Sequence, residues 1–331
     1  MVRFGFIGTN WITDKFIDAA QQIDGFVVQA VYSRTKDKAK AFADKHGAKM
    51  TYTDVDVFAE SEEIDAVYIA SPNALHKDHA ITCMQNGKHV IVEKAMASNV
   101  SEVEVMIQTA KDNHVVLKEA IKTTHMPNFD VIRDNLDKIG TVRRYFASYC
   151  QYSSRYDAYK EGTVLNAFKP EFSNGSLMDI GIYCIYPMIA LFGKPTDLKA
   201  NSYMLESGVD GQGSILFDYK EQGINGMVMY SKISNSYVPS EIQGEKGSII
   251  IDNISQPQHV EIKYKDGSTE TLSQDQKDNS MYYEAKHFME LIREAKMEST
   301  INTYRTSLLT AEVLEEARKQ IGLVFPADQH D

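Results

Sequence analysis

Short apolar runs alternate with longer stretches that carry an apolar residue at every third or fourth position, as far along the chain as Ala120. An apolar run of four to eight residues is typical of a buried strand, and the longer spacing is typical of an amphipathic helix. The predicted strands are residues 2–7, 26–32, 66–70, 89–92 and 115–118, and the predicted helices are 11–22, 35–46, 75–86 and 100–113. Because strands and helices alternate with short connections, the pattern predicts βαβ units and a doubly wound parallel sheet.

The pattern changes after Glu119. From about residue 196 to 273 it becomes a series of strands, and Asp266-Gly267 predicts a hairpin turn among them. The other predicted elements are a helix at 128–137, a strand at 142–149, a helix at 175–192, and closing helices near 280–297 and 303–321, with an irregular stretch at 150–174. This part is therefore expected to be α+β with a largely antiparallel sheet.

Taken together, these elements predict the α/β fold class in two domains. The first, residues 1–121, is expected to be a Rossmann domain with a doubly wound parallel sheet. The second, residues 122–331, is expected to be an α+β domain with a large, mostly antiparallel open sheet, and the closing helices can pack back on the first domain. Because a long open sheet needs a cover, we expect a homodimer or homotetramer.

Composition and charge narrow the class of protein. Lys and Arg number 35 against 46 Asp and Glu, so the formal charge is −11, which argues against nucleic acid and anionic membranes as partners. No apolar run approaches membrane-spanning length, and the chain enters a strand at once without a signal peptide. Cys83, Cys150 and Cys184 are scattered and in no metal-binding spacing. These features favour a cytoplasmic protein without a metal site.

The stretch "GFIGTNWIT", residues 5–13, joins the first predicted strand to the first helix. A dinucleotide-binding fold places its G-x-G-x-x-G/A turn here, and the helix N-terminus then receives the pyrophosphate. Gly8 keeps the first conserved glycine position, whereas Asn10 and Thr13 occupy the other two. Asn tolerates a left-handed backbone, so Asn10 is expected to make the turn. An ordinary βα turn is the alternative; the predicted cofactor contacts are Gly8, Thr9, Asn10, Trp11 and Ile12.

The end of the second strand distinguishes the two nicotinamide cofactors. An NAD-binding site usually carries Asp or Glu there for the ribose hydroxyls. This chain has Ser33 and Arg34 instead, followed by Lys36 and Lys38, and Arg is suited to a 2′-phosphate. We therefore expect NADP rather than NAD, bound through Ser33, Arg34 and Lys38, with a solvated basic helix start as the alternative.

Four motifs now lie in order along the chain: "GFIGTNWIT", "YIASPNALHKDHA", "GKHVIVEKAM" and "GSLMDIGIYCI". Together they resemble the glucose–fructose oxidoreductase / inositol dehydrogenase (Gfo/Idh/MocA) family, in particular the branch of dimeric dihydrodiol dehydrogenase and NADP-dependent D-xylose dehydrogenase. The resemblance covers nearly the whole chain. It implies an oxidoreductase that transfers a hydride between a nicotinamide and a small sugar, polyol, diol or related carbonyl substrate.

The resemblance also implies roles for single residues. Lys94 matches the catalytic lysine of the family's Glu-Lys-Pro motif, although Ala95 replaces the proline, which often has a cis peptide bond, and leaves the loop geometry open. Asp179 and Tyr183 match the family's Asp-x-Gly-x-His motif, with tyrosine in place of histidine as the proposed acid. The segment expected along the ribose and nicotinamide contains Ser71, Asn73 and His76.

The same residues can be interpreted without the family. A lysine where a strand leaves an apolar sheet is costly unless it has a role, and Lys94 lies at the crevice edge where such sheets bind ligands. There its charge would stabilise a developing alkoxide, and Glu93 beside it would orient the ammonium or the nicotinamide ribose. The alternatives are an exposed loop lysine paired with Glu93 and, for Tyr183, an ordinary core tyrosine on an apolar helix.

Further candidates have two interpretations each. Glu119 and His125 are expected either to line a cleft or to pack at a hinge, and the aromatic group Tyr152, Tyr156 and Tyr159 with Arg155 either to face a polyol or to cover a subunit interface. A nucleotide-sensing regulator without turnover is the competing function, because a fold alone does not fix an activity. The presence of Lys94, Asp179 and Tyr183 together favours the enzyme; the identity of the substrate stays open.

Overall fold

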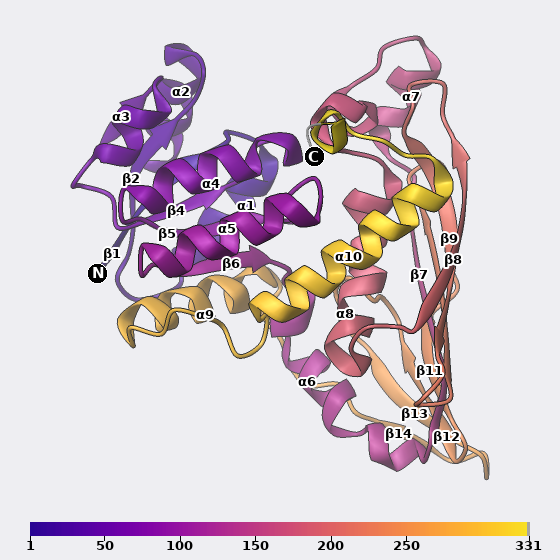
Figure 1. Cartoon of the computed structure of the whole chain (residues 1–331). Helices are drawn as coiled ribbons and strands as arrows, with labels where there is room; N and C mark the ends of the chain where they lie inside the picture. The colour runs from indigo at the N-terminus through magenta and orange to yellow at the C-terminus, as the bar shows by residue number, and fades with distance from the viewer. Residues whose placement is uncertain (330–331) are drawn as a thin grey trace. The chain divides into compact units, whose positions relative to one another are not determined.

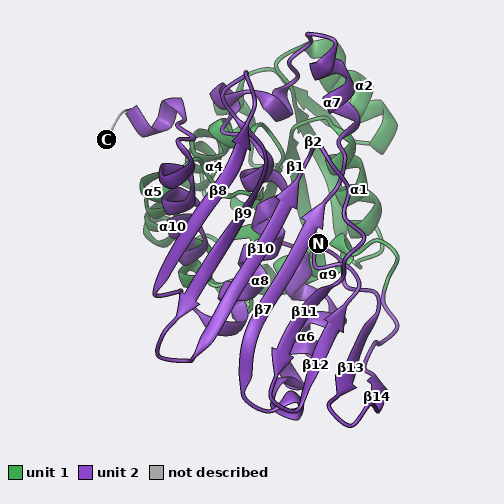
Figure 2. Cartoon of the chain, turned by 90° about the vertical axis from the view of Figure 1, so that its right-hand side faces the viewer, with its two compact units in different colours: residues 1–120, 277–307 green, residues 121–276, 308–331 purple. Residues whose placement is uncertain are grey.

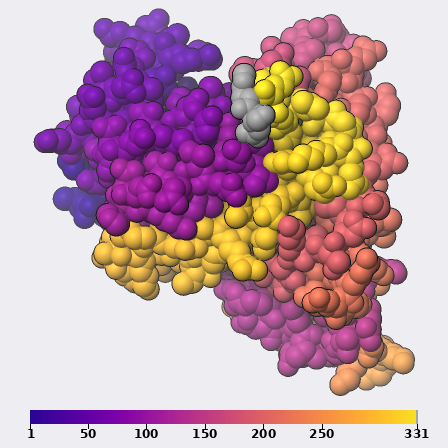
Figure 3. All heavy atoms as spheres, in the orientation of Figure 1, coloured from indigo at the N-terminus to yellow at the C-terminus, as the bar shows by residue number. Residues whose placement is uncertain are grey.

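A computed structural model of the chain describes residues 1–329 of the 331. The chain forms two compact units (Figure 2). Unit 1 consists of residues 1–120 and 277–307, and unit 2 consists of residues 121–276 and 308–331. Each unit therefore consists of two segments that lie far apart in the sequence. Figure 3 shows the atoms of the later segment of unit 1, in light orange, packed directly against the first 120 residues.

Unit 1 is built on a six-stranded parallel sheet (Figure 1) with the strand order β3-β2-β1-β4-β5-β6. This is the order of a Rossmann fold, in which ligands bind at the carboxyl ends of the strands where the order reverses, here between β1 and β4. The strands are β1 (Val2–Ile7), β2 (Phe26–Tyr32), β3 (Met50–Tyr52), β4 (Ala66–Ile69), β5 (His89–Glu93) and β6 (Leu117–Ala120). The predicted parallel sheet is confirmed, and β3 is an addition that its short half-buried run did not reveal.

One predicted strand is displaced. The apolar run at residues 115–118 predicted a strand there, but β6 begins at Leu117 and ends at Ala120. The reason is pairing: Val90 lies opposite Leu117 and Val92 lies opposite Glu119 in the parallel register with β5. The shift makes Lys118 and Glu119 buried strand residues, with 1% and 3% exposure.

Helices cover both faces of this sheet. Phe4, Phe16 and Phe288, from β1, α1 and α9, belong to one apolar core, so the first helix and a helix from the end of the chain cover the same face. The helices of unit 1 are α1 (Trp11–Ala20), α2 (Lys36–His46), α3 (Val55–Glu60), α4 (His76–Gln85), α5 (Val100–Asp112), α9 (Met281–Arg293) and the short η1 (Asn73–Leu75). The start of α10 (Tyr304–Ile321) also belongs to unit 1.

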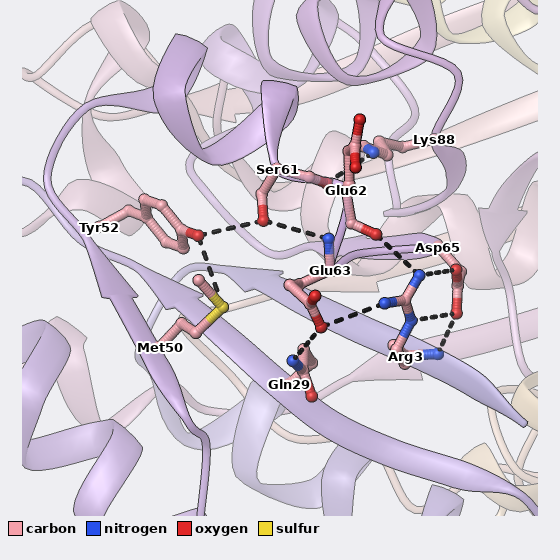
Figure 4. A network of polar contacts seen from close by, with 9 residues as sticks. All are labelled: Arg3, Gln29, Met50, Tyr52, Ser61, Glu62, Glu63, Asp65 and Lys88. Carbon is pink, nitrogen blue, oxygen red and sulfur yellow. Dashed lines mark hydrogen bonds and ion pairs between the residues drawn. The ribbon is translucent and has the colours of Figure 1, made fainter.

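The amino ends of the strands carry a polar network of their own (Figure 4). The Arg3 guanidinium donates through Nε and Nη2 to the two Asp65 carboxylate oxygens, at 3.0 and 2.7 Å, and through Nη1 to Glu63 at 3.2 Å. Lys88 Nζ donates to the Ser61 carbonyl at 2.7 Å. These groups pair with one another at the edge opposite the strand ends that bind ligands, so we interpret them as stabilising the fold.

Unit 2 is built on an eight-stranded sheet with the order β14-β13-β12-β11-β7-β10-β9-β8. All its neighbours are antiparallel except β7 and β10, so the predicted, mostly antiparallel sheet is confirmed. The strands are β7 (Val142–Cys150), β8 (Asp197–Met204), β9 (Asp210–Tyr219), β10 (Ile224–Ser231), β11 (Ser240–Gly244), β12 (Gly247–Ile251), β13 (Val260–Tyr264) and β14 (Thr269–Thr271). The turn at Asp266-Gly267 joins the last two, as predicted.

A long helical stretch packs on the inner face of this sheet. It starts as a π-helix, η6 (Leu177–Gly181), and continues as α8 (Ile182–Phe192), whose Cys184 carbonyl accepts a hydrogen bond from Tyr145 Oη of β7 at 2.9 Å. The remaining helices of unit 2 are α6 (Pro127–Asp134), α7 (Ser154–Lys160), most of α10, and the short η2 (Thr123–His125), η3 (Leu136–Ile139), η4 (Asn166–Phe168), η5 (Pro170–Phe172) and η7 (Pro326–Gln329).

The stretch Pro170–Phe192 corrects one expectation from the sequence. It is 23 residues long and its most apolar 18-residue window has a mean hydropathy of 1.5, so by length and composition it is long and apolar enough to cross a membrane, contrary to the prediction from the sequence. The run was missed because polar residues interrupt it before the short helical segments join. Of its most apolar window, 72% is buried inside the protein, as is typical of a core helix.

Candidate active site

The turn after β1 has the geometry of a phosphate-binding loop. Gly8 adopts φ 108°, in the region that favours glycine, and a Cβ there would lie 2.5 Å from the Ala70 carbonyl oxygen. Thr13, fully buried in α1, donates its hydroxyl to the Gly8 carbonyl at 3.0 Å. Gly8 thus brings the loop close to the end of β4 and directs the N-terminus of α1 to the carboxyl edge of the sheet, where a pyrophosphate fits.

Asn10 shapes this loop through its side chain, whereas the sequence predicted that its backbone makes the turn. Its backbone is extended, with φ −110° and ψ 175°, so the left-handed turn is made by Gly8 and not by Asn10. The Asn10 side chain instead caps α1 by accepting from the Ile12 and Thr13 backbone N–H groups at 3.0 and 3.4 Å. Its Nδ2 donates to the Ala70 carbonyl at 2.8 Å, which ties the loop to β4.

The side chains beyond the loop differ in exposure. Trp11 is 56% exposed, with Lys15 Nζ 5.3 Å from its ring centre. Ser33, whose backbone N–H donates to the Tyr52 carbonyl at 3.1 Å, follows β2 directly, and Arg34 and Lys38 after it are exposed. No carboxylate stands at this strand end, which leaves Ser33 and the cationic Arg34 nearest the place where an adenosine ribose lies in such folds.

Lys94 follows β5 directly, at the carboxyl edge of the sheet. It is partly exposed, whereas Glu93 before it and Ala95 after it are buried. The Lys94–Ala95 peptide bond is cis, so the loop has the geometry that the family's proline often gives. Glu93 accepts a hydrogen bond from the Tyr68 hydroxyl of β4 at 2.5 Å, which fixes the carboxylate beside the lysine.

Glu119 of β6 holds the loop from the other side. Its Oε1 accepts from the Met96 backbone N–H at 2.9 Å. Burial raises the pKa of Glu119 to about 7, against the effect of hydrogen bonds from Ser307 and Met96 and of the nearby Lys94 charge. The sequence placed Glu119 among cleft or hinge residues; its contact with the Lys94 loop was not predicted.

His76, predicted to contact the cofactor, is fully buried and connects two loops. Its Nδ1 lies 3.0 Å from the Ala95 carbonyl and its Nε2 lies 2.8 Å from the Ser71 carbonyl. Burial lowers the pKa of His76 to about 4, against the effect of its contacts with the Ser71 and Ala95 carbonyls. These contacts tie the Lys94 loop to the Ser71 segment, and the predicted contact of His76 with the cofactor stays a prediction. Ser71 also bonds His79 at 3.0 Å, and Asn73 is 8% exposed at the start of η1.

In unit 2, Asp179 lies in the π-helix and Tyr183 in the first turn of α8. The sequence predicted an ordinary α-helix here, on which residues four apart share a face; the π-turn is wider, and such turns occur frequently at functional sites. The turn is fixed by Asp210, whose Oδ2 accepts from the Leu177 N–H at 2.7 Å. Tyr183 is partly exposed and packs edge-on against Tyr149, with ring centres 5.7 Å apart.

Lys232 is the residue of this group that sequence reasoning missed. Its Nζ lies 2.6 Å from Asp179 Oδ2, and its side chain is only 4% exposed. The signal was the same as for Lys94, because Lys232 directly follows the apolar strand β10 (Ile224–Ser231). The apolar run at Gly226–Tyr230 ends two residues before it.

The other candidates pack within unit 2. The rings of Tyr156 and Tyr159 on α7 are stacked 5.7 Å apart, and both lie within 6 Å of the Phe168 ring. Cys184 is buried, and burial raises the pKa of its thiol, in agreement with a core residue. His125 is buried in η2 at 7% exposure. Among residues 1–329, no group of three or more His, Cys, Asp or Glu side chains could hold a metal ion.

Comparison with known proteins identifies the family to which the chain belongs. A family model described as an oxidoreductase family with an NAD-binding Rossmann fold (GFO/IDH/MocA) matches residues 2–120, and the model of the family's C-terminal domain matches residues 135–250. The chain is 57% identical over 329 residues to scyllo-inositol 2-dehydrogenase (NADP⁺) of Bacillus subtilis, covering 99% of this chain and 100% of the relative. It is 29% identical to mouse trans-1,2-dihydrobenzene-1,2-diol dehydrogenase, covering 99% of both chains.

Solved structures agree in fold. A 3-ketoreductase from Actinomadura kijaniata, in complex with NADP and TDP-benzene, superposes with a TM-score of 0.85 at 22% identity, covering 97% of this chain and 98% of the other. Levoglucosan dehydrogenase, in complex with NADH and levoglucosan, superposes with a TM-score of 0.84 at 19% identity, covering 97% of each chain. At these identities the likeness concerns the fold alone.

Proposed function

The chain belongs to the GFO/IDH/MocA oxidoreductase family, and we propose that it oxidises one secondary alcohol of a cyclic polyol with NADP⁺ and reduces the corresponding ketone in reverse. The family and the reaction class, an NAD(P)-dependent oxidoreductase acting on an alcohol or carbonyl, confirm the sequence-based prediction. The observation that carries the substrate proposal is the full-length relative, 57% identical, that acts on scyllo-inositol with NADP⁺.

The residues of unit 1 fit an NADP cofactor. Gly8 leaves room beside the Ala70 carbonyl that a side chain would fill, and the capped N-terminus of α1 begins there. Ser33 and Arg34 at the end of β2 would hold the 2′-phosphate, because a guanidinium pairs with phosphate through several donors. Ser71, Asn73 and Glu93 belong to the segments expected along the ribose and nicotinamide. When bound, the cofactor supplies the carbon that accepts the hydride.

The chain's own residues then handle the proton and the charge on oxygen. As the C–H bond gives up its hydride, the O–H bond must give up its proton, so a base is needed at that oxygen. We assign this base to Tyr183 and the stabilising charge to the ammonium of Lys94. Glu93, held by Tyr68, and the loop bonded by Glu119 keep Lys94 in place. Asp179 accepts a hydrogen bond from a hydroxyl of the substrate.

Turnover on a defined panel tests the proposal. The purified enzyme is given NADP⁺ with scyllo-inositol, myo-inositol, a trans-dihydrodiol and D-xylose, and NADPH formation is followed. We expect the highest kcat/KM with an inositol. Tight NADP⁺ binding without turnover on any member of the panel would instead favour the nucleotide-sensing regulator, and highest turnover on the dihydrodiol or xylose would replace the cyclic polyol as substrate.

We also propose that the enzyme is a homodimer or homotetramer that buries the outer face of the unit 2 sheet. Figure 2 shows this face without covering helices from its own unit. Leu216 of β9 lies beside Met227 of β10, which lies beside Phe146 of β7 in the strand register. Leu216 is 57% exposed and the other two are partly exposed, so an apolar row crosses the sheet at its surface. Such a face is typical of a subunit interface.

Sedimentation of the purified chain tests the assembly. We expect a dimer or tetramer at micromolar concentration, and Leu216→Asp should shift it toward monomer because a buried carboxylate at the interface has no partner. The exposed Tyr203→Asp at the edge strand β8 is a control for added charge. A monomer for the unmutated chain would rule the interface out.

We further infer a cytoplasmic location, which fits the three free cysteines.

A further inference from the structure

Lys232 is held in place by its backbone on both sides. Its N–H donates to the Gly211 carbonyl of β9 at 2.9 Å, and its own carbonyl accepts from the Ser153 N–H at 2.8 Å. The turn that follows is fixed by the Ser231 hydroxyl, which accepts from the Ile233 and Ser234 N–H groups at 3.1 and 2.9 Å. The side chain therefore leaves a well-ordered strand end in a defined direction.

The ammonium of Lys232 lies in a prepared environment. It forms an ion pair with Asp179 Oδ2 at 2.6 Å, lies 5.1 Å from the centre of the Phe168 ring, and lies 3.5 Å from the Ala167 carbonyl. An aromatic face and a carbonyl both favour a cation. Because a buried ammonium is costly without such partners, the site is built for the charge of Lys232.

The two partners of the ion pair differ in exposure. The Lys232 side chain is 4% exposed, whereas Asp179 is 32% exposed. Lys232 thus holds the carboxylate from the buried side, and the carboxylate lies at the surface of the unit. A second acid, Asp210, is fully buried and feels the Lys232 charge, but it is bonded to the Leu177 N–H. The contact that Lys232 makes is therefore with the acid that faces solvent.

We propose that Lys232 is a positioning residue for substrate binding: its ion pair orients Asp179 so that the carboxylate accepts a hydrogen bond from a substrate hydroxyl other than the one oxidised. This inference rests on the proposed function of Asp179. A carboxylate fixed in this way selects polyols with a hydroxyl at the matching ring position, because a deoxy analogue leaves the acceptor unpaired. Lys232 then contributes to specificity without touching the substrate.

The consequence for kinetics is a change in binding more than in chemistry. The hydrogen bond to Asp179 is present in both the bound substrate and the transition state, so its loss raises KM and leaves kcat nearly unchanged. A loosened carboxylate costs about ten- to a hundredfold in kcat/KM, as misplacement of a contact group commonly does. A merely structural role would instead lower thermal stability without separating KM from kcat.

The test compares Lys232→Met and Lys232→Arg with the unmutated enzyme on the preferred inositol and its deoxy analogue. We expect Lys232→Met to raise KM for the inositol about tenfold or more, to bring it close to that of the deoxy analogue, and to leave NADPH affinity unchanged. Lys232→Arg should restore most of the discrimination because it keeps the charge. Lys194→Met, at an exposed ion pair with Glu312 elsewhere in unit 2, is the matched control.

Two further variants cover the remaining outcomes. Asp179→Asn should reproduce the KM effect, and the double variant with Lys232→Met should add little to it, since the two residues act as one unit. If Lys232→Met does not fold, Lys232→Gln carries the same comparison. Unchanged KM and discrimination in the folded variant would overturn the inference while the proposed function stands. No turnover by the unmutated enzyme would overturn both.

Discussion

The backbone N–H of Met96 donates to the Glu119 carboxylate at 2.9 Å, and this bond joins the loop that begins at Lys94 to the neighbouring strand β6. The acceptor is a buried carboxyl whose pKa burial raises to about 7 from 4.5. The carboxyl that holds the Lys94 loop therefore changes its charge near neutral pH.

Glu119→Gln should change how stability depends on pH. With a folded pKa above the unfolded one, Glu119 keeps a proton that the unfolded chain releases, so the unmutated protein loses stability as pH rises from about 4.5 to about 7. Each pKa unit corresponds to about 1.4 kcal/mol, so the loss reaches a few kcal/mol. Glutamine removes this loss and can still accept from Met96.

Urea unfolding of both proteins at several pH values from 5 to 8 measures this effect. The free energy of unfolding of Glu119→Gln, relative to the unmutated protein, should grow with pH and level off above about 7. Gln243→Glu, at a partly exposed position on β11, serves as a control for the amide–carboxylate exchange itself. Parallel curves for Glu119→Gln and the unmutated protein would show that the buried carboxyl does not titrate in this range.

Much of the fold was predictable, because the spacing of apolar residues and the turn residues between elements are local features of the sequence. Strands β1 and β2 begin and end at the predicted residues, and the Asp266-Gly267 hairpin was read from two residues. The shift of β6 to Leu117–Ala120 was not predictable in this way, since its register depends on pairing with β5. The partnership of residues 277–307 with the first 120 residues likewise depends on long-range packing against α1.

The candidate site likewise contains residues that local motifs predict and residues that only long-range contacts bring in. Lys94, Asp179 and Tyr183 could be proposed from motifs, but their supporting partners come from elsewhere in the sequence. Lys232 lies 53 residues from Asp179, and Glu119 lies 23 residues from Met96, so no local pattern connects them. Asn10 shows the opposite error: the residue was chosen correctly for the loop, but its side chain caps the helix instead of its backbone making the turn.

Asn10→Ala should weaken both the loop and cofactor binding. It removes the cap on α1 and the bond to the Ala70 carbonyl, which should lower the free energy of unfolding by about 1–2 kcal/mol. The Kd for NADPH should rise, because the loop is less well fixed. Asn10→Ser keeps a capping oxygen and should recover most of the stability. Equal stability of Asn10→Ala and the unmutated protein, by urea unfolding, would contradict the role of the cap.

Arg34→Ala should reduce the preference of the enzyme for NADPH over NADH. The exposed Arg34 follows Ser33 at a strand end without a carboxylate, so its loss removes the proposed partner of the 2′-phosphate. We expect KM for NADPH to rise at least about tenfold while KM for NADH changes little, since one charge-assisted contact is worth about 1.5–3 kcal/mol. Lys40→Ala, farther along α2, is the control for lost positive charge. Equal use of both cofactors by the unmutated enzyme would contradict the assignment.

Tyr183→Phe should lower kcat by about 10²–10⁴, the usual effect of removing a general acid–base. The ring contact with Tyr149 is kept, and NADPH affinity should hardly change. Tyr149→Phe removes a neighbouring hydroxyl that donates to Gln151 at 3.0 Å and should leave kcat within a few-fold, so the pair separates chemistry from packing. Near-normal turnover of Tyr183→Phe would assign the proton transfer to Lys94 or to a bound water.

Hydride transfer in this enzyme is proposed to depend on the ammonium of Lys94, which directly follows β5. The most direct measurement is NADPH formation from NADP⁺ and the preferred inositol by Lys94→Met, beside NADP⁺ affinity and the thermal unfolding curve of the same variant. We expect turnover to fall by at least about 10³, while NADP⁺ affinity and the unfolding curve stay close to those of the unmutated enzyme. Turnover by folded Lys94→Met within a few-fold of the unmutated rate would contradict it.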